Sequence, residues 1–373
     1  MKMRENLMAV LRHERPHFVP ITIDTGILPR GYTERQLRDM GLCLLELGVS
    51  VFGIKNSNTT MDTSENIASF SADDRYTTIS KQKHIVNRTY RTPIGQVSEK
   101  CNWGYATFEW PTECVIKDLK DYEIVEYVVN DTEYLQNYED FLKTVNNVGD
   151  DGIVGTLTPK SPLQAMLLDL MGYTRFALDY HDCRHEFEEL YDILKKKQLQ
   201  MYKVVADSPA EIVLMDENVN GIVTSPKLFE RYCIPFYDEV AQILHAKDKI
   251  LMAHMDGKLK CLRDLMAKTK IDVIQGFTPP PIGDISITEA MTAWKGKVIW
   301  ATFPATVALE GELDRVEKET INMFESAAPG DDFALGITDD IGDIRSTRYY
   351  EVLKTITRAV VERGSYPITK RTP

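Results

Sequence analysis

The chain contains the segment Ile250-Leu-Met-Ala-His254-Met255-Asp256-Gly257, in which an apolar run ends abruptly in a histidine, a carboxylate and a glycine. A short apolar run bounded by glycine is typical of a buried parallel strand. His254 and Asp256 would then project from the carboxyl edge of a sheet, where α/β folds place their chemistry. Imidazole and carboxylate serve both as metal ligands and as proton-transfer groups.

Seven further short runs of apolar or β-branched residues stop at turn-forming residues, and most are separated by amphipathic helical patterns. The eight expected strands are residues 18–24, 49–54, 152–157, 212–217, 249–254, 271–277, 297–303 and 332–337. Ser225 followed by Pro226 is typical of a helix start. Eight strands joined by helices predict an α/β fold of the (β/α)8 class, a TIM barrel.

One interval interrupts the alternation of strands and helices. Residues 57–111 are polar and alternate as strands do, with a turn at Thr92-Pro-Ile-Gly95. We expect an antiparallel β excursion inserted after the second strand. No linker composition appears in the 373 residues, so a single barrel domain over residues 1–373 is expected.

Composition limits the class of protein. Hydrophobic residues make up 43% and charged residues 27%, which are ordinary globular values. The net charge of -12 disfavours nucleic acid and anionic membranes as partners. No signal peptide and no apolar run of about 18 residues is present, so a cytoplasmic protein is expected. The six cysteines form no C-x-x-C pair, which predicts reduced thiols.

The carboxyl ends of the expected strands bring several oxygen groups and one imidazole toward a common mouth. They are Asp24, Asp216, Glu217, His254, Asp256, Gln275, Thr302, Asp339 and Asp340. Glu217 and His254 would lie on adjacent strands, which are about 4.8 Å apart. Other interpretations stay open: Asp216 or Asn218 could be the inward group instead of Glu217, His254 could be a framework residue, and Asp339-Asp340 could cap the next helix.

Several further segments occur in a characteristic order. They are Arg12-His-Glu-Arg-Pro-His-Phe-Val-Pro20, Thr92-Pro-Ile-Gly95, Asp216-Glu-Asn218, Ser225-Pro-Lys-Leu-Phe-Glu-Arg-Tyr-Cys-Ile-Pro-Phe-Tyr237, His254-Met-Asp-Gly257, Ala328-Pro-Gly330 and Phe333-Ala-Leu-Gly336. Together they resemble the uroporphyrinogen decarboxylase superfamily. This superfamily includes the decarboxylase and the methyltransferases of corrinoid-dependent methyl transfer, and the resemblance implies a (β/α)8 barrel.

The places where this chain departs from the superfamily's motifs indicate which of its members the chain resembles most. The decarboxylase holds its substrate's carboxylates with an R-Q-A-G-R motif after the first strand, where this chain has Asp24 followed by Thr25 and Gly26. The thiol methyltransferases bind zinc through His-x-Cys and a distant cysteine, whereas this chain has Asp256 in place of the motif cysteine. Carboxylates make a harder zinc site that prefers an oxygen ligand.

The resemblance therefore implies a corrinoid-dependent methyltransferase that takes a methyl group from an oxygen-linked donor, such as a methoxylated aromatic compound. It implies zinc as Lewis acid and, because no cobalamin domain is evident, a separate corrinoid protein as partner. The expected zinc ligands are Glu217, His254, Asp256 and Asp339, and the expected catalytic residues are Asp24, Glu217 and His254. The alternatives are a lyase of the decarboxylase type, a thiol-methylating enzyme and a non-catalytic binding protein.

Overall fold

A computed structural model of the chain describes residues 2–74, 77–103, 109–338, 341–344 and 346–369. The chain divides into two units. The barrel unit comprises Met1–Phe52, Gln136–Lys160 and Tyr202–Pro373, and the accessory unit comprises Gly53–Leu135 and Ser161–Met201. Every described residue expected at the carboxyl edge of the sheet belongs to the barrel unit.

The barrel unit is built on a parallel sheet with the order β10-β11-β12-β13-β14-β15-β1-β2-β9. Its strands are β1 (Ile21–Asp24), β2 (Cys43–Glu46), β9 (Gly152–Val154), β10 (Thr156–Thr158), β11 (Ile212–Met215), β12 (Ile250–His254), β13 (Val273–Phe277), β14 (Val298–Thr302) and β15 (Phe333–Ile337). Only Gly155 separates β9 from β10, so the two ends of the sheet are halves of one interrupted strand. The ring is therefore an eight-stranded barrel, and the predicted fold class is confirmed.

Alternate strand residues fill the inside of the barrel, among them Leu45, Leu214, Met252 and Trp300. Helix α1 (Met3–Leu11) adds Leu7, Val10 and Leu11 to this cluster. Arg4 of α1 pairs with Glu211, which immediately precedes β11, at 3.0 Å. Helix α1 thus lies at the amino end of the barrel, opposite the carboxyl ends of the strands.

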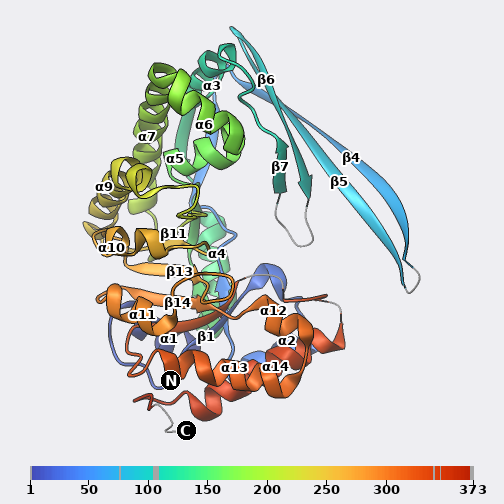
Figure 1. The fold of residues 1–373 in the computed structure, drawn as a ribbon, viewed down its shortest axis with the longest axis vertical. Coiled ribbons are helices and arrows are strands. Elements are labelled where there is room, and N and C mark those ends of the chain that lie inside the picture. The colour runs from blue at the N-terminus through green and yellow to red at the C-terminus, as the bar shows by residue number, and fades with distance from the viewer. Residues whose placement is uncertain (1, 75–76, 104–108, 339–340, 345, 370–373) are drawn as a thin grey trace. The chain divides into compact units, whose positions relative to one another are not determined.

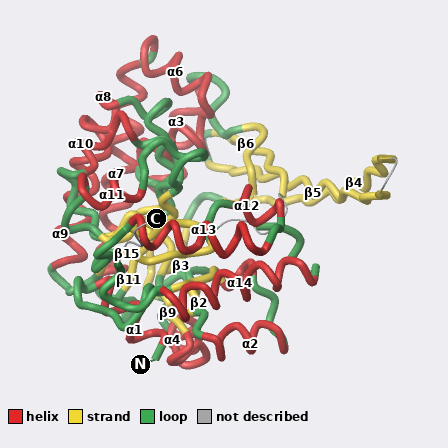
Figure 2. The backbone as a smooth tube through the Cα atoms, turned by 60° about the horizontal axis from the view of Figure 1, so that its bottom comes forward, coloured by secondary structure: helices red, strands yellow, loops and turns green. Residues whose placement is uncertain are grey.

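Helices follow the strands as the amphipathic patterns predict. They are α2 (Tyr32–Met40), α4 (Glu139–Val148), α8 (Pro226–Leu228), the π-helix η4 (Phe229–Cys233), α9 (Ile234–His245), α10 (Arg263–Met266), α11 (Ile287–Ala293), α12 (Ala305–Glu310), α13 (Leu313–Ser326) and α14 (Thr347–Arg363). Ser225 caps α8 by accepting a hydrogen bond from the Leu228 amide, as Ser-Pro at a helix start predicts. Helices α13, α14 and α2 pack side by side outside the strands (Figure 2).

The second barrel strand is Cys43–Glu46, not the expected residues 49–54. Gly41, in a left-handed conformation at φ 116, ends α2 and turns the chain directly into the short run Cys43-Leu-Leu. Val49 and Val51 raise the strand propensity of residues 49–54. The end of this segment does form a strand, β3 (Phe52–Asn56), but outside the barrel. That strand pairs with β8 (Thr132–Gln136) in a separate two-stranded sheet.

The accessory unit contains the predicted antiparallel excursion, which Figure 1 shows as long ribbons. Its strands are β4 (Thr60–Asp74), β5 (Thr77–Thr92), β6 (Gly95–Trp103) and β7 (Glu109–Glu113). The helices of the unit are α3 (Lys120–Asp131), α5 (Pro162–Gln164), the π-helix η3 (Ala165–Met171), α6 (Gly172–Asp182) and α7 (Arg184–Ala206), which runs on into the barrel unit. Tyr122 ties α3 to α6 by donating to Asp179 at 2.8 Å. In the described part of the chain, no helix is both long and apolar enough to cross a membrane.

Candidate functional site

His254 ends β12 and lies on the inner face of the barrel. It is two residues after Met252, which packs in the interior, and alternate residues of a strand share a face. Its register partner on β13 is Gln275, and the two side chains interact through His254 Nδ1 and Gln275 Oε1 at 2.6 Å. An amide oxygen only accepts hydrogen bonds, so Nδ1 donates and Nε2 remains for other partners.

Asp256 is the second member of the site. Its Oδ2 lies 3.8 Å from His254 Nε2, and its Oδ1 is buried without a hydrogen-bond partner among the described residues. Burial lowers the pKa of His254, but Asp256, together with Gln275 and Asp216, raises it by more, to about 9. Burial likewise raises the pKa of Asp256, and the His254 ring lowers it by more. At neutral pH the pair is therefore an imidazolium beside a carboxylate.

The two acidic residues after β11 occupy different surroundings. Asp216 pairs with Lys160 at 3.6 Å, and its charge helps to raise the pKa of His254. Glu217 is fully buried near Tyr237 of α9, whose pKa is raised by burial and by the neighbouring Cys233 and Glu217 side chains. The Glu217 amide donates to the Met215 carbonyl, which breaks the strand's alternation at this point. The charge of Asp216 thus acts on His254, in agreement with the alternative that Asp216 is the inward group, and Glu217 as a metal ligand stays a prediction.

Asp24 lies at the carboxyl end of β1. Its carboxylate accepts a hydrogen bond from the Gly26 amide at 2.7 Å and so caps a short 3-10 turn. Burial raises the pKa of Asp24, and the nearby charge of Glu46 raises it further. Glu46 itself accepts hydrogen bonds from the Thr25 hydroxyl at 2.6 Å and the Gly48 amide at 2.9 Å.

Sequence reasoning did not find Glu46 or Lys160. Glu46 was missed because the second strand was expected at residues 49–54, and the glutamate that ends Cys43-Leu-Leu-Glu46 was the available signal. Lys160 lies just past the end of β10, in Thr158-Pro-Lys160, where a charged residue after an expected strand could have been noticed. Both residues lie at or just beyond the carboxyl ends of barrel strands.

The donors of the site fit zinc only in part. Ligands bonded at about 2.0–2.2 Å lie roughly 3.3 Å apart on a tetrahedral ion, so His254 Nε2 and Asp256 Oδ2 need only a small approach from 3.8 Å. The buried, unsatisfied Oδ1 of Asp256 is consistent with a missing partner. Asp339 lies outside the described residues, and among those described no three His, Cys, Asp or Glu side chains are grouped to hold a metal.

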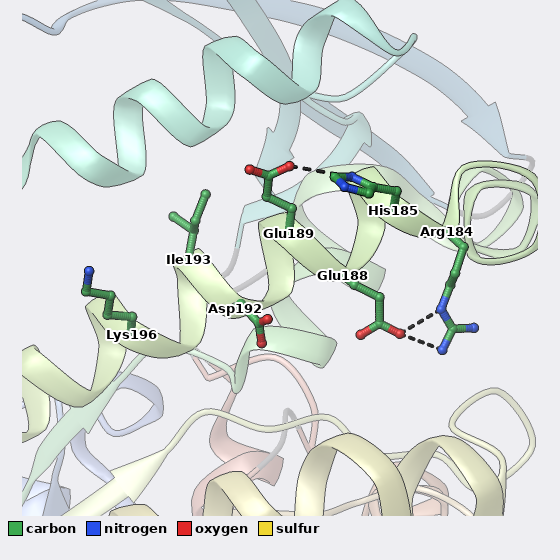
Figure 3. Close-up of a pocket in the computed structure, with 7 residues that line it drawn as sticks. All are labelled: Arg184, His185, Glu188, Glu189, Asp192, Ile193 and Lys196. Carbon is green, nitrogen blue, oxygen red and sulfur yellow. Dashed lines mark hydrogen bonds and ion pairs between the residues drawn. The ribbon is translucent and has the colours of Figure 1, made fainter.

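A separate surface cavity runs along one face of α7 in the accessory unit (Figure 3). It is lined by Arg184, His185, Glu188, Glu189, Asp192, Ile193 and Lys196. Two pairs of its side chains interact between successive turns: Arg184 pairs with Glu188 at 2.5 Å, and His185 lies 3.6 Å from Glu189. This pattern is typical of a solvated helix face, and the cavity shares no residue with the site in the barrel unit.

A closed parallel barrel with titratable side chains at its carboxyl edge defines a protein of the (β/α)8 class. Residues 153–330 match the family model of uroporphyrinogen decarboxylase (URO-D), so the predicted resemblance to this superfamily is confirmed. The matched segment begins in β9 and includes Asp216, Glu217, His254 and Asp256. No curated protein matches the chain.

Solved structures of similar fold include a methyltransferase from Methanosarcina mazei. It is 14% identical, with a TM-score of 0.55 over 97% of this chain and 99% of the other. Weaker similarity extends to a Bacteroidetes-affiliated GH5 cellulase, with 9% identity and a TM-score of 0.37 over 62% of this chain and 78% of the other. It also extends to a GH20 catalytic module of a pneumococcal exo-beta-D-N-acetylglucosaminidase, with 10% identity and a TM-score of 0.41 over 93% and 85%. At these identities the likeness shows the fold alone.

Proposed function

We propose that this protein is a cytoplasmic methyltransferase of a corrinoid-dependent system. It would take a methyl group from an oxygen-linked donor, such as a methoxylated aromatic compound, and pass it to Co(I) of a separate corrinoid protein. The observation that carries the proposal is the pair formed by His254 and Asp256 at the carboxyl end of β12. The family match over residues 153–330 and the fold shared with a methyltransferase support the same class of reaction.

Cleavage of a methyl ether is limited by its poor leaving group. As Co(I) supplies the electron pair for a new bond to the methyl carbon, the electron pair of the C–O bond passes to the oxygen. His254 suits the task of stabilising that oxygen, because a pKa of about 9 keeps its ring protonated at neutral pH. The proton would move from Nε2 to the oxygen, solvent would restore it, and Asp256 would stabilise the charged ring between turnovers.

Zinc is the second way to activate the same oxygen, and when bound it would supply a Lewis acid for it. His254 Nε2 and the Asp256 carboxylate are the described groups that would hold the ion, and Glu217 and Asp339 are the further ligands that the sequence predicts. Metal binding requires an unprotonated ring nitrogen. Acid catalysis by His254 and zinc coordination by His254 therefore exclude each other, and both use Nε2.

Docking of a macromolecular acceptor is supported by apolar side chains in the segments that follow barrel strands. Tyr32, Ile222 and Leu309 are 77%, 70% and 63% exposed after β1, β11 and β14, and Ile282 is exposed after the end of β13. Segments that follow the strands of a barrel lie at its carboxyl face. Exposed apolar groups gathered at one face are typical of protein interaction sites.

The test is a donor screen with the purified full-length chain. Methoxylated aromatic compounds, methylamines, methyl thioethers and porphyrinogen polycarboxylates would be incubated with chemically reduced cobalamin, and loss of Co(I) absorbance and release of carbon dioxide would be followed. The proposal predicts Co(I) methylation with an oxygen-linked donor and appearance of the free phenol. Carbon dioxide release without methyl transfer would assign the decarboxylase-type reaction instead, and methylation from sulfur or nitrogen donors alone would overturn the oxygen preference.

A further inference from the structure

We infer that Gln275 and the backbone of Gly276 position the His254 ring, so that Nε2 and not Nδ1 is the nitrogen used in the reaction. The inference rests on the proposed function in that it names which atom of His254 acts. It concerns residues that touch the ring and would not contact the methyl donor. Gln275 and Gly276 are thus positioning residues.

Gln275 holds the end of β12 at two points. Its side-chain oxygen accepts a hydrogen bond from His254 Nδ1 at 2.6 Å, and its main-chain carbonyl accepts one from the Met255 amide at 2.8 Å. Gln275 is 2% exposed, so water does not compete for the contact. A buried hydrogen bond of this length fixes both the tilt of the ring and the nitrogen that carries the proton.

Gly276 fixes the plane of the ring from one side. The register between β13 and β14 shifts between Gln275 and Phe277, and Gly276 within this bulge has φ 74, a left-handed conformation that favours glycine. A Cβ atom at this position would lie 2.5 Å from Cε1 and 2.6 Å from Nδ1 of His254. The bulge therefore lets bare backbone lie against the imidazole, and any larger residue would displace the ring.

The consequence is the same in both modes of activation. With Nδ1 committed to Gln275, a neutral ring presents the lone pair of Nε2 to a metal, and a protonated ring presents Nε2–H to a substrate oxygen. Nε2 is also the nitrogen that lies 3.8 Å from Asp256. As a neutral side chain, Gln275 holds the proton on Nδ1 without adding a further negative charge to the site.

The test compares Gln275→Leu, which removes the acceptor, with Gln275→Glu, which keeps an oxygen acceptor. Protein with 15N-labelled histidine would be studied by NMR while the pH is raised until the ring signals of each variant stop shifting, so that the neutral ring is observed, and His254→Ala would assign the signal. We expect the Nδ1–H form in the wild type and in Gln275→Glu, and a mixture with the Nε2–H form in Gln275→Leu. Zinc affinity of Gln275→Leu, measured with the metal alone, should fall by about 10–100-fold, with affinity largely restored in Gln275→Glu.

An unchanged tautomer in folded Gln275→Leu, together with zinc affinity within about twofold of the wild type, would overturn the inference. Thermal unfolding of each variant shows whether the chain has folded, and Gln275→Glu serves as the second variant if Gln275→Leu has not. If Gln275→Leu does not fold, finding the Nε2–H form in the wild type or in Gln275→Glu would overturn the inference. The tautomer is read without any methyl transfer, so a fixed Nδ1–H form in a protein inactive toward every donor would keep the inference and reject the proposed function.

Discussion

His254 and Asp256 face each other across 3.8 Å at the carboxyl end of β12, with His254 Nε2 and Asp256 Oδ2 as the closest atoms. Only Met255 separates them in the sequence, and its side chain is fully buried. The two charged groups therefore share one side of the strand end, and each stabilises the charged form of the other.

Replacing Asp256 by Asn should lower the pKa of His254 from about 9, because Asp256 is the main cause that raises it. A pKa above the ordinary value of 6.5 gives stability that is complete below pH 6.5 and is lost between pH 6.5 and 9. The stability gained in this way is at most about 3.5 kcal/mol, since one pKa unit corresponds to about 1.4 kcal/mol. The free energy of unfolding of chelator-treated wild type should fall over this range more steeply than that of Asp256→Asn. Parallel pH profiles for the two proteins would contradict the assigned coupling.

Gly276→Ala should lower the free energy of unfolding by more than the cost of placing an alanine in a left-handed conformation. An alanine at positive φ costs about 1–2 kcal/mol, and displacing the His254 ring should add roughly 1–3 kcal/mol of overpacking. Gly296→Ala is the matched control, because Gly296 has φ 87 and an added Cβ atom there would meet no atom of the described residues within 4 Å. Denaturant unfolding of both variants separates the two costs. Equal losses in the two variants would show that the bulge does not press on the ring.

Acidic substitutions in the exposed apolar segments should separate the docking of the corrinoid protein from chemistry. Ile222→Asp and Leu309→Asp should slow methyl transfer to a protein-bound corrinoid by about tenfold, equivalent to about 1.4 kcal/mol of lost interaction. Transfer to free reduced cobalamin should stay within about twofold. Leu142→Asp, on α4 and 48% exposed, is the control for an acidic group placed elsewhere on the surface. Equal slowing with free and protein-bound acceptor would argue against docking at these side chains.

Zinc content should depend on His254. Elemental analysis of wild type after dialysis against zinc should give close to one equivalent, and His254→Ala should retain about a tenth of it or less, because loss of a ligand removes most of the affinity. His181→Ala, with a side chain 87% exposed in the accessory unit, controls for adventitious binding. Equal zinc in all three proteins would place the ion elsewhere.

The barrel could be predicted from sequence because its strands are short apolar runs with sharp ends. Ile250–His254 and Val298–Thr302 lie where the pattern indicates, since strands that are buried on both faces carry apolar residues on both. The second strand was misplaced because Cys43–Glu46 has only four residues and no β-branched side chain. Propensity therefore favoured a segment that pairs elsewhere.

The site could be predicted in part. His254 and Asp256 follow from the end of one strand, whereas the choice between Asp216 and Glu217 depends on a turn that interrupts alternation at Met215. The bulge at Gly276 is likewise invisible to a two-residue period, because a single extra residue shifts the register. Local backbone irregularity thus decided which groups lie beside His254.

The most direct measurement is single-turnover transfer of a 13C-labelled methyl group from a methoxylated aromatic donor to reduced cobalamin, comparing wild type with His254→Ala and with His181→Ala. We expect the label on cobalt and the free phenol in equal amounts with wild type and His181→Ala, and a rate at least about 100-fold lower with His254→Ala. Label transfer at the wild-type rate by folded His254→Ala would contradict the central role of this histidine.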